Sequence, residues 1–294
     1  MTSPRIGEIL DGAYQLDRLI GAGGVGAVYQ ATHLHLGRPV AIKILHSSAR
    51  AQPDSLQRFA KEARILGSLG HPAFVSVHHF AYTQGGLPYL VMELCDGETL
   101  RERLQRGPFS LGSEEDRAAL LGVFGPLCAA LDQAHDQGIL HRDLKPDNLM
   151  LLRGGGVKIL DFGMAKLVSD TEALTENGMV MGTPNYLAPE RVRGRAAERR
   201  SDVFALGLIL YEALTGRLAY EAESPLATMY AILEEPVPPL RGAQQREAPF
   251  IDDPRAVYVD RVIARATARD VKDRYPTAAA LMTALADALG DARP

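Results

Sequence analysis

Short apolar runs separated by turn residues fill the chain as far as Glu93, and this pattern predicts β-strands. The predicted strands span residues 14–20, 25–32, 39–45, 74–80 and 88–93. One segment in this region, 54–70, instead repeats Leu56, Phe59, Ala63 and Leu66 at helical spacing. The first part of the chain is therefore expected to be a small, mostly β unit with one helix.

From Leu100 onward the apolar positions follow the period of an α-helix. The predicted helices span residues 100–105, 113–137, 200–215, 224–234, 257–267 and 277–289. Ser113 with Asp116 three residues later resembles a capping box, with Asp in place of the usual Glu. Between Ile139 and Glu190 the helical period gives way to short strands and loops. The pattern as a whole predicts an α+β protein with a small β-rich N-lobe and a larger, mostly helical C-lobe.

Composition narrows the classes of protein that this pattern allows. The 294 residues suit one large domain or two lobes, and 46% hydrophobic residues can bury a sizeable core. A net charge of -4 argues against a dedicated nucleic-acid binder, which is usually basic. Cys95 and Cys128 form no CxxC pair, so we expect neither a disulfide framework nor a zinc site. A reducing, cytoplasmic compartment fits this cysteine usage.

Two apolar stretches, 118–131 and 203–214, are the longest in the chain. Both are shorter than the roughly 20 residues that a membrane-spanning helix needs. The N-terminal residues show no apolar segment behind a basic start, so no signal peptide is expected. We therefore expect core helices and no membrane segment in this chain.

Glycines at positions 21, 23 and 26 allow the backbone to approach phosphate oxygens closely. A mobile glycine-rich turn is the plain alternative. A dinucleotide-binding turn uses similar spacing but is followed directly by a helix. Here Ala27 to Gln30 favour a strand, which predicts a glycine-rich hairpin over a nucleotide.

Lys43 ends the apolar run Val40-Ala41-Ile42, where a lysine is often only a surface residue. The next predicted helix offers Glu62 as an acidic partner. A Lys43–Glu62 pair would hold the ammonium group against the α- and β-phosphates of a nucleotide.

The segment His141-Arg142-Asp143-Leu144-Lys145-Pro146-Asp147-Asn148 carries the sharpest chemical signal. Asp143 can accept a hydroxyl proton, Lys145 can neutralise a transferring phosphoryl group, and Asn148 can supply an oxygen to a divalent cation. Asp161-Phe162-Gly163 places a second carboxylate after an apolar strand, where Asp161 can bind Mg²⁺. These motifs together, in this order, predict phosphoryl transfer.

At this point the sequence resembles the eukaryotic-like protein kinases, and specifically the bacterial Hanks-type serine/threonine kinases. The resemblance runs from about Tyr14 to Leu289. It includes Gly-Thr-Pro-Asn-Tyr-Leu-Ala-Pro-Glu at 182–190, Ser-Asp-Val-Phe-Ala-Leu-Gly at 201–207 and Asp-Arg-Tyr-Pro at 273–276. It implies an N-terminal extension 1–13, an N-lobe 14–93, a hinge 94–98, a C-lobe 99–290 and a tail 291–294.

The resemblance also assigns roles to individual residues. It implies ATP with Mg²⁺ or Mn²⁺, with Met92 at the gatekeeper position and the backbone of Glu93 and Cys95 at the hinge. The remaining nucleotide-binding residues that it implies are Ile20, Gly21, Ala22, Gly23, Gly24, Val25, Gly26, Val28, Ala41 and Met150. It further implies a Glu190–Arg274 ion pair and an Asp202 that anchors the backbone at His141 and Arg142.

Lys145 and Thr183 place the chain, by this resemblance, among kinases that phosphorylate serine or threonine of proteins. Tyrosine kinases usually differ in the catalytic loop, and small-molecule phosphotransferases lack the 182–190 pattern. A pseudokinase that only binds partners is the rival from another class, and the complete catalytic set argues against it.

The arginine that precedes the catalytic aspartate, Arg142, implies control by activation-loop phosphorylation. The loop, about 164–182, offers Thr175 as the main autophosphorylation site and Thr171 as the second candidate. Asn177 stands where bacterial relatives commonly carry another threonine, which argues against a doubly phosphorylated switch. Expected partners are protein substrates with serine or threonine, and the resemblance to bacterial relatives adds a homodimer through the N-lobe.

Overall fold

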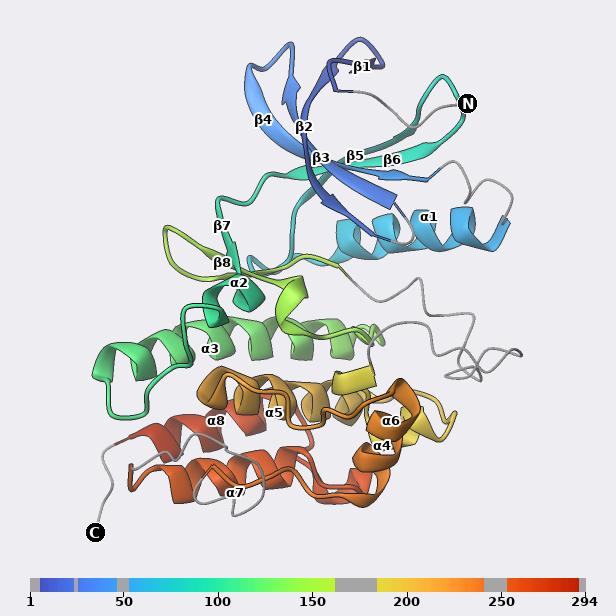
Figure 1. The fold of residues 1–294 in the computed structure, drawn as a ribbon. Coiled ribbons are helices and arrows are strands. Elements are labelled where there is room, and N and C mark those ends of the chain that lie inside the picture. The colour runs from blue at the N-terminus through green and yellow to red at the C-terminus, as the bar shows by residue number, and fades with distance from the viewer. Residues whose placement is uncertain (1–5, 24–25, 47–52, 162–183, 241–252, 291–294) are drawn as a thin grey trace. The chain divides into compact units, whose positions relative to one another are not determined.

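The computed structural model describes residues 6–23, 26–46, 53–161, 184–240 and 253–290. The chain forms two compact units, residues 1–96 and residues 97–294. The first unit is dominated by a β-sheet and the second by helices (Figure 1). The expected division into a β-rich lobe and a larger helical lobe is confirmed.

A six-stranded antiparallel sheet in the order β1-β2-β3-β4-β6-β5 makes up the first unit. Its strands are β1 (Ile9–Leu10), β2 (Tyr14–Ala22), β3 (Gly26–His33), β4 (Arg38–Leu45), β5 (Val77–Tyr82) and β6 (Pro88–Glu93). Helix α1 (Pro53–Ser68) packs on β5 and β6 (Figure 1). Leu16, Ile42 and Tyr89, all with 0% exposure, lie in the core of the sheet.

One predicted strand begins too early. We predicted 74–80, but β5 starts at Val77. Of the preceding apolar residues, Ala73 lies in a turn, Phe74 forms an isolated bridge and Val75 lies in an irregular segment. These three side chains are only 2–3% exposed. An apolar run indicates burial, and burial here does not require a continuous strand.

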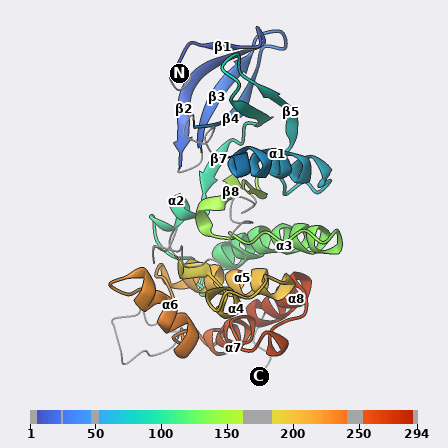
Figure 2. The same cartoon turned by 90° about the vertical axis from the view of Figure 1, so that its right-hand side faces the viewer.

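The second unit contains seven α-helices within its described residues. They are α2 (Leu100–Leu104), α3 (Glu114–Asp136), α4 (Pro189–Val192), α5 (Arg199–Thr215), α6 (Pro225–Glu234), α7 (Ala256–Ala266) and α8 (Ala278–Leu289). Helix α5 is buried throughout 201–215, which explains why its sequence is apolar on every side. It packs on α7 and α8, and α8 packs on α3 (Figure 2).

A small three-stranded antiparallel sheet in the order β7-β8-β9 also belongs to the second unit. It consists of β7 (Gly97–Thr99), β8 (Leu149–Leu152) and β9 (Val157–Ile159). A Cβ atom on Gly97 would lie 2.0 Å from the carbonyl oxygen of Leu151, so this pairing requires glycine. The short 3-10 helix η2 (Pro146–Asn148) leads directly into β8.

Only half of the predicted capping box at Ser113 is present. The Ser113 hydroxyl accepts a hydrogen bond from the Asp116 amide at 3.2 Å. The Asp116 carboxylate, however, accepts from the amide of Ser110 at 2.8 Å, and the Ser113 amide donates to the carbonyl of Ser110. Aspartate is one methylene shorter than the glutamate of a full capping box, and its carboxylate here binds the preceding turn.

Among the described helices, none has the length and apolar character that crossing a bilayer requires.

Candidate active site

The first unit contributes a buried ion pair. Lys43 Nζ, from β4, lies 2.9 Å from Glu62 Oε1, from α1, and the side chains are 14% and 7% exposed. The predicted pair is therefore present. Because both side chains are largely shielded from water, the contact fixes the position of the ammonium group more firmly than a surface pair would.

Strand register aligns the predicted nucleotide-binding residues of this unit. Gly21 lies opposite Val28, Val28 opposite Lys43, and Ala41 opposite Met92. Ala41 and Met92 are 7% and 6% exposed, whereas Ile20 is 39% exposed.

The glycine at position 26 meets a steric demand, because a Cβ atom there would lie 2.4 Å from the Ile44 carbonyl oxygen. Glu93 ends β6, and Cys95 is partly exposed just after it. Gly24 and Val25 lie outside the described residues.

The second unit contributes the loop that contains Asp143. Lys145 Nζ lies 3.4 Å from Asp143 Oδ2, and Asn148 Nδ2 donates to the Asp143 carbonyl oxygen at 2.8 Å. The structure thus brings together the three residues that the sequence predicted for proton acceptance, charge neutralisation and cation binding.

Asp161 and Asn148 lie at the same end of the β8–β9 hairpin. Leu149 pairs with Ile159, and the amide of Leu160 donates to the carbonyl of Asn148 at 2.9 Å. Because Nδ2 of Asn148 faces Asp143, the amide oxygen of the same side chain is the atom suited to a cation.

The donor set in this part of the chain fits a magnesium ion. The described residues contain no group of three or more His, Cys, Asp or Glu side chains that could hold a metal. The carboxylate of Asp161 and the amide oxygen of Asn148 are therefore the two candidate ligands. Such a pair suits Mg²⁺, because this ion keeps several waters and takes its other ligands from substrate phosphates.

Asp202, from α5, anchors the loop that contains Asp143. Its Oδ2 accepts from the His141 amide at 2.9 Å and its Oδ1 from the Arg142 amide at 3.1 Å. Arg142 has φ of 67°, a conformation that is unfavourable for a residue with a Cβ atom. The predicted contacts of Asp202 with this backbone are present, and the two hydrogen bonds stabilise its unfavourable conformation.

Sequence reasoning missed His135, which completes the anchor. His135 is 2% exposed, and its Nε2 lies 2.7 Å from Asp202 Oδ2. Its Nδ1 lies 3.8 Å from Asp132, whose carboxylate accepts hydrogen bonds from the amides of Ala278 and Ala279 in α8.

The electrostatics of this cluster keep Asp202 ionised. Burial alone would lower the pKa of His135, but Asp132 and Asp202 outweigh burial and raise it to about 9. Burial would raise the pKa of Asp202, but His135 and the His141 amide hold it below its usual value. The imidazolium thus supplies the charge that a buried carboxylate needs.

A second missed group surrounds Arg101 of α2. Its Nη2 lies 2.7 Å from the Tyr186 hydroxyl and 3.4 Å from Asp147, and its Nη1 donates to Glu212. The Tyr186 hydroxyl also donates to Glu212. These contacts tie α2, η2 and α5 to the segment that follows Thr183.

Glu190 and Arg274 form the predicted ion pair. Arg274 Nη2 lies 2.8 Å from Glu190 Oε2 and Nη1 lies 2.9 Å from Oε1, a bidentate contact between buried side chains. Burial would raise the pKa of Glu190, but Arg274 holds it below its usual value. Thr171, Thr175 and Thr183 lie outside the described residues.

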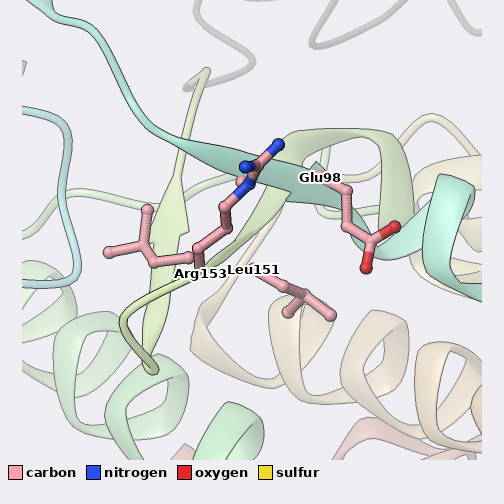
Figure 3. A pocket seen from close by; sticks show the side chains of 5 residues that line it. Glu98, Leu151 and Arg153 are labelled. Atoms are coloured by element: carbon pink, nitrogen blue, oxygen red, sulfur yellow. The ribbon is translucent and has the colours of Figure 1, made fainter.

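A hollow of about 270 Å³ lies on the β7–β8 pair, lined by Gly97, Glu98, Leu151, Leu152 and Arg153 (Figure 3). Met150, the predicted nucleotide contact of this unit, precedes Leu151 in β8 and pairs with Thr99. None of the predicted catalytic residues lines this hollow, so it is not the candidate active site.

Comparisons with known proteins agree with these motifs. Residues 14–284 match the protein kinase domain family. The chain is 40% identical over 274 residues to the probable serine/threonine-protein kinase PknB of Corynebacterium glutamicum, covering 90% of this chain and 40% of that protein. It is 43% identical over 243 residues to the serine/threonine-protein kinase PknA of Mycobacterium tuberculosis, covering 81% and 55%.

Solved structures give the same fold. Two crystal structures of variants of the Mycobacterium tuberculosis PknI kinase domain match with TM-scores of 0.71 and 0.67, at 23% and 24% identity. Each comparison covers 98% of this chain and all of that domain. The family match spans residues 14–284, which is 271 of the 294 residues, and it establishes the family of the chain. The chain therefore belongs to the protein kinase domain family, and bacterial serine/threonine-protein kinases are among its relatives.

Proposed function

We propose that this chain transfers the γ-phosphoryl group of ATP to serine or threonine hydroxyls of proteins. The observation that carries the proposal is the Asp143–Lys145–Asn148 cluster. It lies on a loop whose backbone is held by hydrogen bonds to Asp202. Relatives named serine/threonine-protein kinases support it, although the chain spans only about 40% of the length of several of them.

In this mechanism the first unit binds the nucleotide. The backbone at Gly21, Gly23 and Gly26 approaches the phosphates, and Lys43, oriented by Glu62, neutralises the α- and β-phosphates. Ala41 and Met92, adjacent in the sheet, contact the adenine ring. These residues hold the nucleotide in one orientation, which removes much of the entropic part of the barrier.

The second unit acts on the acceptor. Asp143 orients the hydroxyl and accepts its proton as the hydroxyl oxygen bonds to the γ-phosphorus. The bond from that phosphorus to the bridging oxygen breaks, and ADP leaves with the bond electrons. Lys145 neutralises charge on the phosphoryl group in transit, which favours the transition state over the ground state.

Asn148 and Asp161 would hold the divalent cation that kinases of this family use, and we propose Mg²⁺ with Mn²⁺ as the alternative. When bound, the ion supplies positive charge to the phosphate oxygens.

The experiment is transfer of labelled γ-phosphate to a generic protein substrate by the whole chain. Asp143→Asn is expected to lower turnover by about 10²–10⁴-fold, the usual contribution of a positioned acid or base, and to leave ATP binding largely intact. Asp136→Asn, a carboxylate 72% exposed at the end of α3, is the matched control and should keep normal turnover.

A pseudokinase is the second candidate, and the same experiment separates the two. ATP binding without label on protein would favour the scaffold, and equal activity of Asp143→Asn would refute the assigned role. Mapping of labelled sites tests the regulatory proposal, in which Thr175 is the main autophosphorylation site and Thr171 the second. Active protein without phosphate on either threonine would contradict it. The N-lobe homodimer stays a prediction.

A further inference from the structure

The side chain of His46 contacts the backbone of the glycine-rich segment at Gly23. It follows β4 directly, and its Nε2 lies 2.9 Å from the carbonyl oxygen of Gly23. A carbonyl oxygen only accepts hydrogen bonds, so Nε2 must carry the proton and donate. Strand register explains the contact, because Gly26 pairs with Leu45 and places the end of β4 beside the start of β3.

Two hydrogen bonds hold Gly23. The residue is exposed, and a Cβ atom on it would have no neighbour within 4 Å. The Gly23 amide donates to the Gly26 carbonyl at 2.9 Å, which closes the base of the hairpin. The Gly23 carbonyl accepts from His46, and this contact is the one that a side chain supplies.

The hydrogen bond from His46 to the Gly23 carbonyl favours binding of phosphate groups by this segment. A glycine backbone has unusually wide conformational freedom, and a binding site that must order such a backbone loses affinity. A carbonyl oxygen turned toward phosphate would also repel it. A donor that holds the Gly23 carbonyl therefore favours polyphosphate binding in two ways.

We propose that His46 is a positioning residue for the nucleotide phosphates, acting through its hydrogen bond to the Gly23 carbonyl. The proposal rests on the function proposed above and adds one residue to the phosphate-binding machinery. His46 touches the loop backbone, and no contact of its own with the nucleotide is required.

The test compares dissociation constants for ATP, ADP and adenosine, measured by calorimetry on the whole chain with Mg²⁺. His46→Phe keeps a ring but removes the donor, and is expected to weaken ATP and ADP by about 3–10-fold, the usual effect of one hydrogen bond. Adenosine has no phosphate and should bind unchanged. His46→Gln, whose amide nitrogen can replace Nε2, should restore ATP affinity.

His35→Phe is the matched control, because His35 is exposed on the β3–β4 turn and should leave all three constants unchanged. In steady-state assays, His46→Phe should raise KM for ATP and leave kcat and KM for the protein substrate unchanged. Thermal melts of each variant verify folding.

Three results would overturn the proposal. His46→Phe could bind ATP as tightly as the unaltered protein, it could weaken ATP and adenosine equally, or His46→Gln could fail to restore binding. A chain that binds ATP but transfers no phosphate would refute the proposed function and leave these binding comparisons decisive for His46. A chain that binds no nucleotide would overturn both.

Discussion

Removing the carboxylate of Glu190 should destabilise the second unit strongly. Arg274 has a side chain with 0% exposure, and its guanidinium would remain buried after Glu190→Ala without the two contacts at 2.8 and 2.9 Å. Its remaining hydrogen bonds go to the carbonyls of Ala268, Arg200 and Arg269, which carry no net charge. Breaking a buried pair from one side costs about 3–5 kcal/mol, and we expect a loss of that size.

Glu190→Gln should cost less. The amide keeps one oxygen that can accept from Arg274 or from the Ser201 hydroxyl, which donates to Glu190 at 2.5 Å. Hydrogen bonds to charged groups contribute about 1.5–3 kcal/mol, so the loss for this variant should fall in that range. The paired replacement Glu190→Leu with Arg274→Met removes both charges and should recover much of the stability that Glu190→Ala loses.

Urea unfolding followed by circular dichroism at 222 nm is the suitable assay. The protein contains no tryptophan, and its helices are concentrated in the second unit. Asp270→Asn is the matched control, since Asp270 pairs with Lys272 where the side chains are 53% and 75% exposed. That variant should keep the midpoint of the unaltered protein. If Glu190→Ala shifted the midpoint no more than Asp270→Asn does, the reasoning would be refuted.

Two further predictions concern α5 and its neighbours. Because the pKa of His135 is raised from 6.5 to about 9 in the folded protein, its proton contributes stability that is complete below pH 6.5 and is lost as pH rises through about 9. Unfolding measured across pH 6 to 10 should show this loss, and a His135→Asn variant that showed the same alkaline loss would contradict the assignment. Gly207→Ala should destabilise by about 1–3 kcal/mol, the usual cost of overpacking, because its Cβ would lie 2.7 Å from Thr267 Cγ2. A melting temperature equal to that of the unaltered protein would show that α7 moves aside at no cost.

The sequence predicted most of the secondary structure because apolar periodicity records which face of an element is buried. Helix α3 was predicted within one residue at each end, 113–137 against Glu114–Asp136. The same signal misplaced the start of β5, because Ala73 and Val75 are buried outside a strand and Phe74 forms only an isolated bridge. It also gave no indication of β1, which has only two residues and too few positions to show a period.

The predictable part of the site consists of residues held in motifs. Asp143, Asn148 and Asp161 lie in short segments whose chemistry can be read locally. His135 could not be recognised this way, since its partner Asp202 lies 67 positions away and a histidine in an apolar helix usually indicates only core packing. Arg101 and Glu212 are 111 positions apart, and charge alone does not say which of many acidic residues an arginine will meet.

The contacts of His135 also connect the start of α8 to the catalytic loop. Asp132 holds the amides at the first turn of α8 at 3.0 and 2.8 Å, and the imidazole beside it contacts the carboxylate that fixes the backbone of the catalytic loop. The side chains of Asp132, His135 and Asp202 thus connect α8 to the loop that contains Asp143. A displacement of the start of α8 would reach that loop through hydrogen bonds at both ends of this path and through the Asp132–His135 ion pair at 3.8 Å between them, and hydrogen-bond geometry tolerates little displacement.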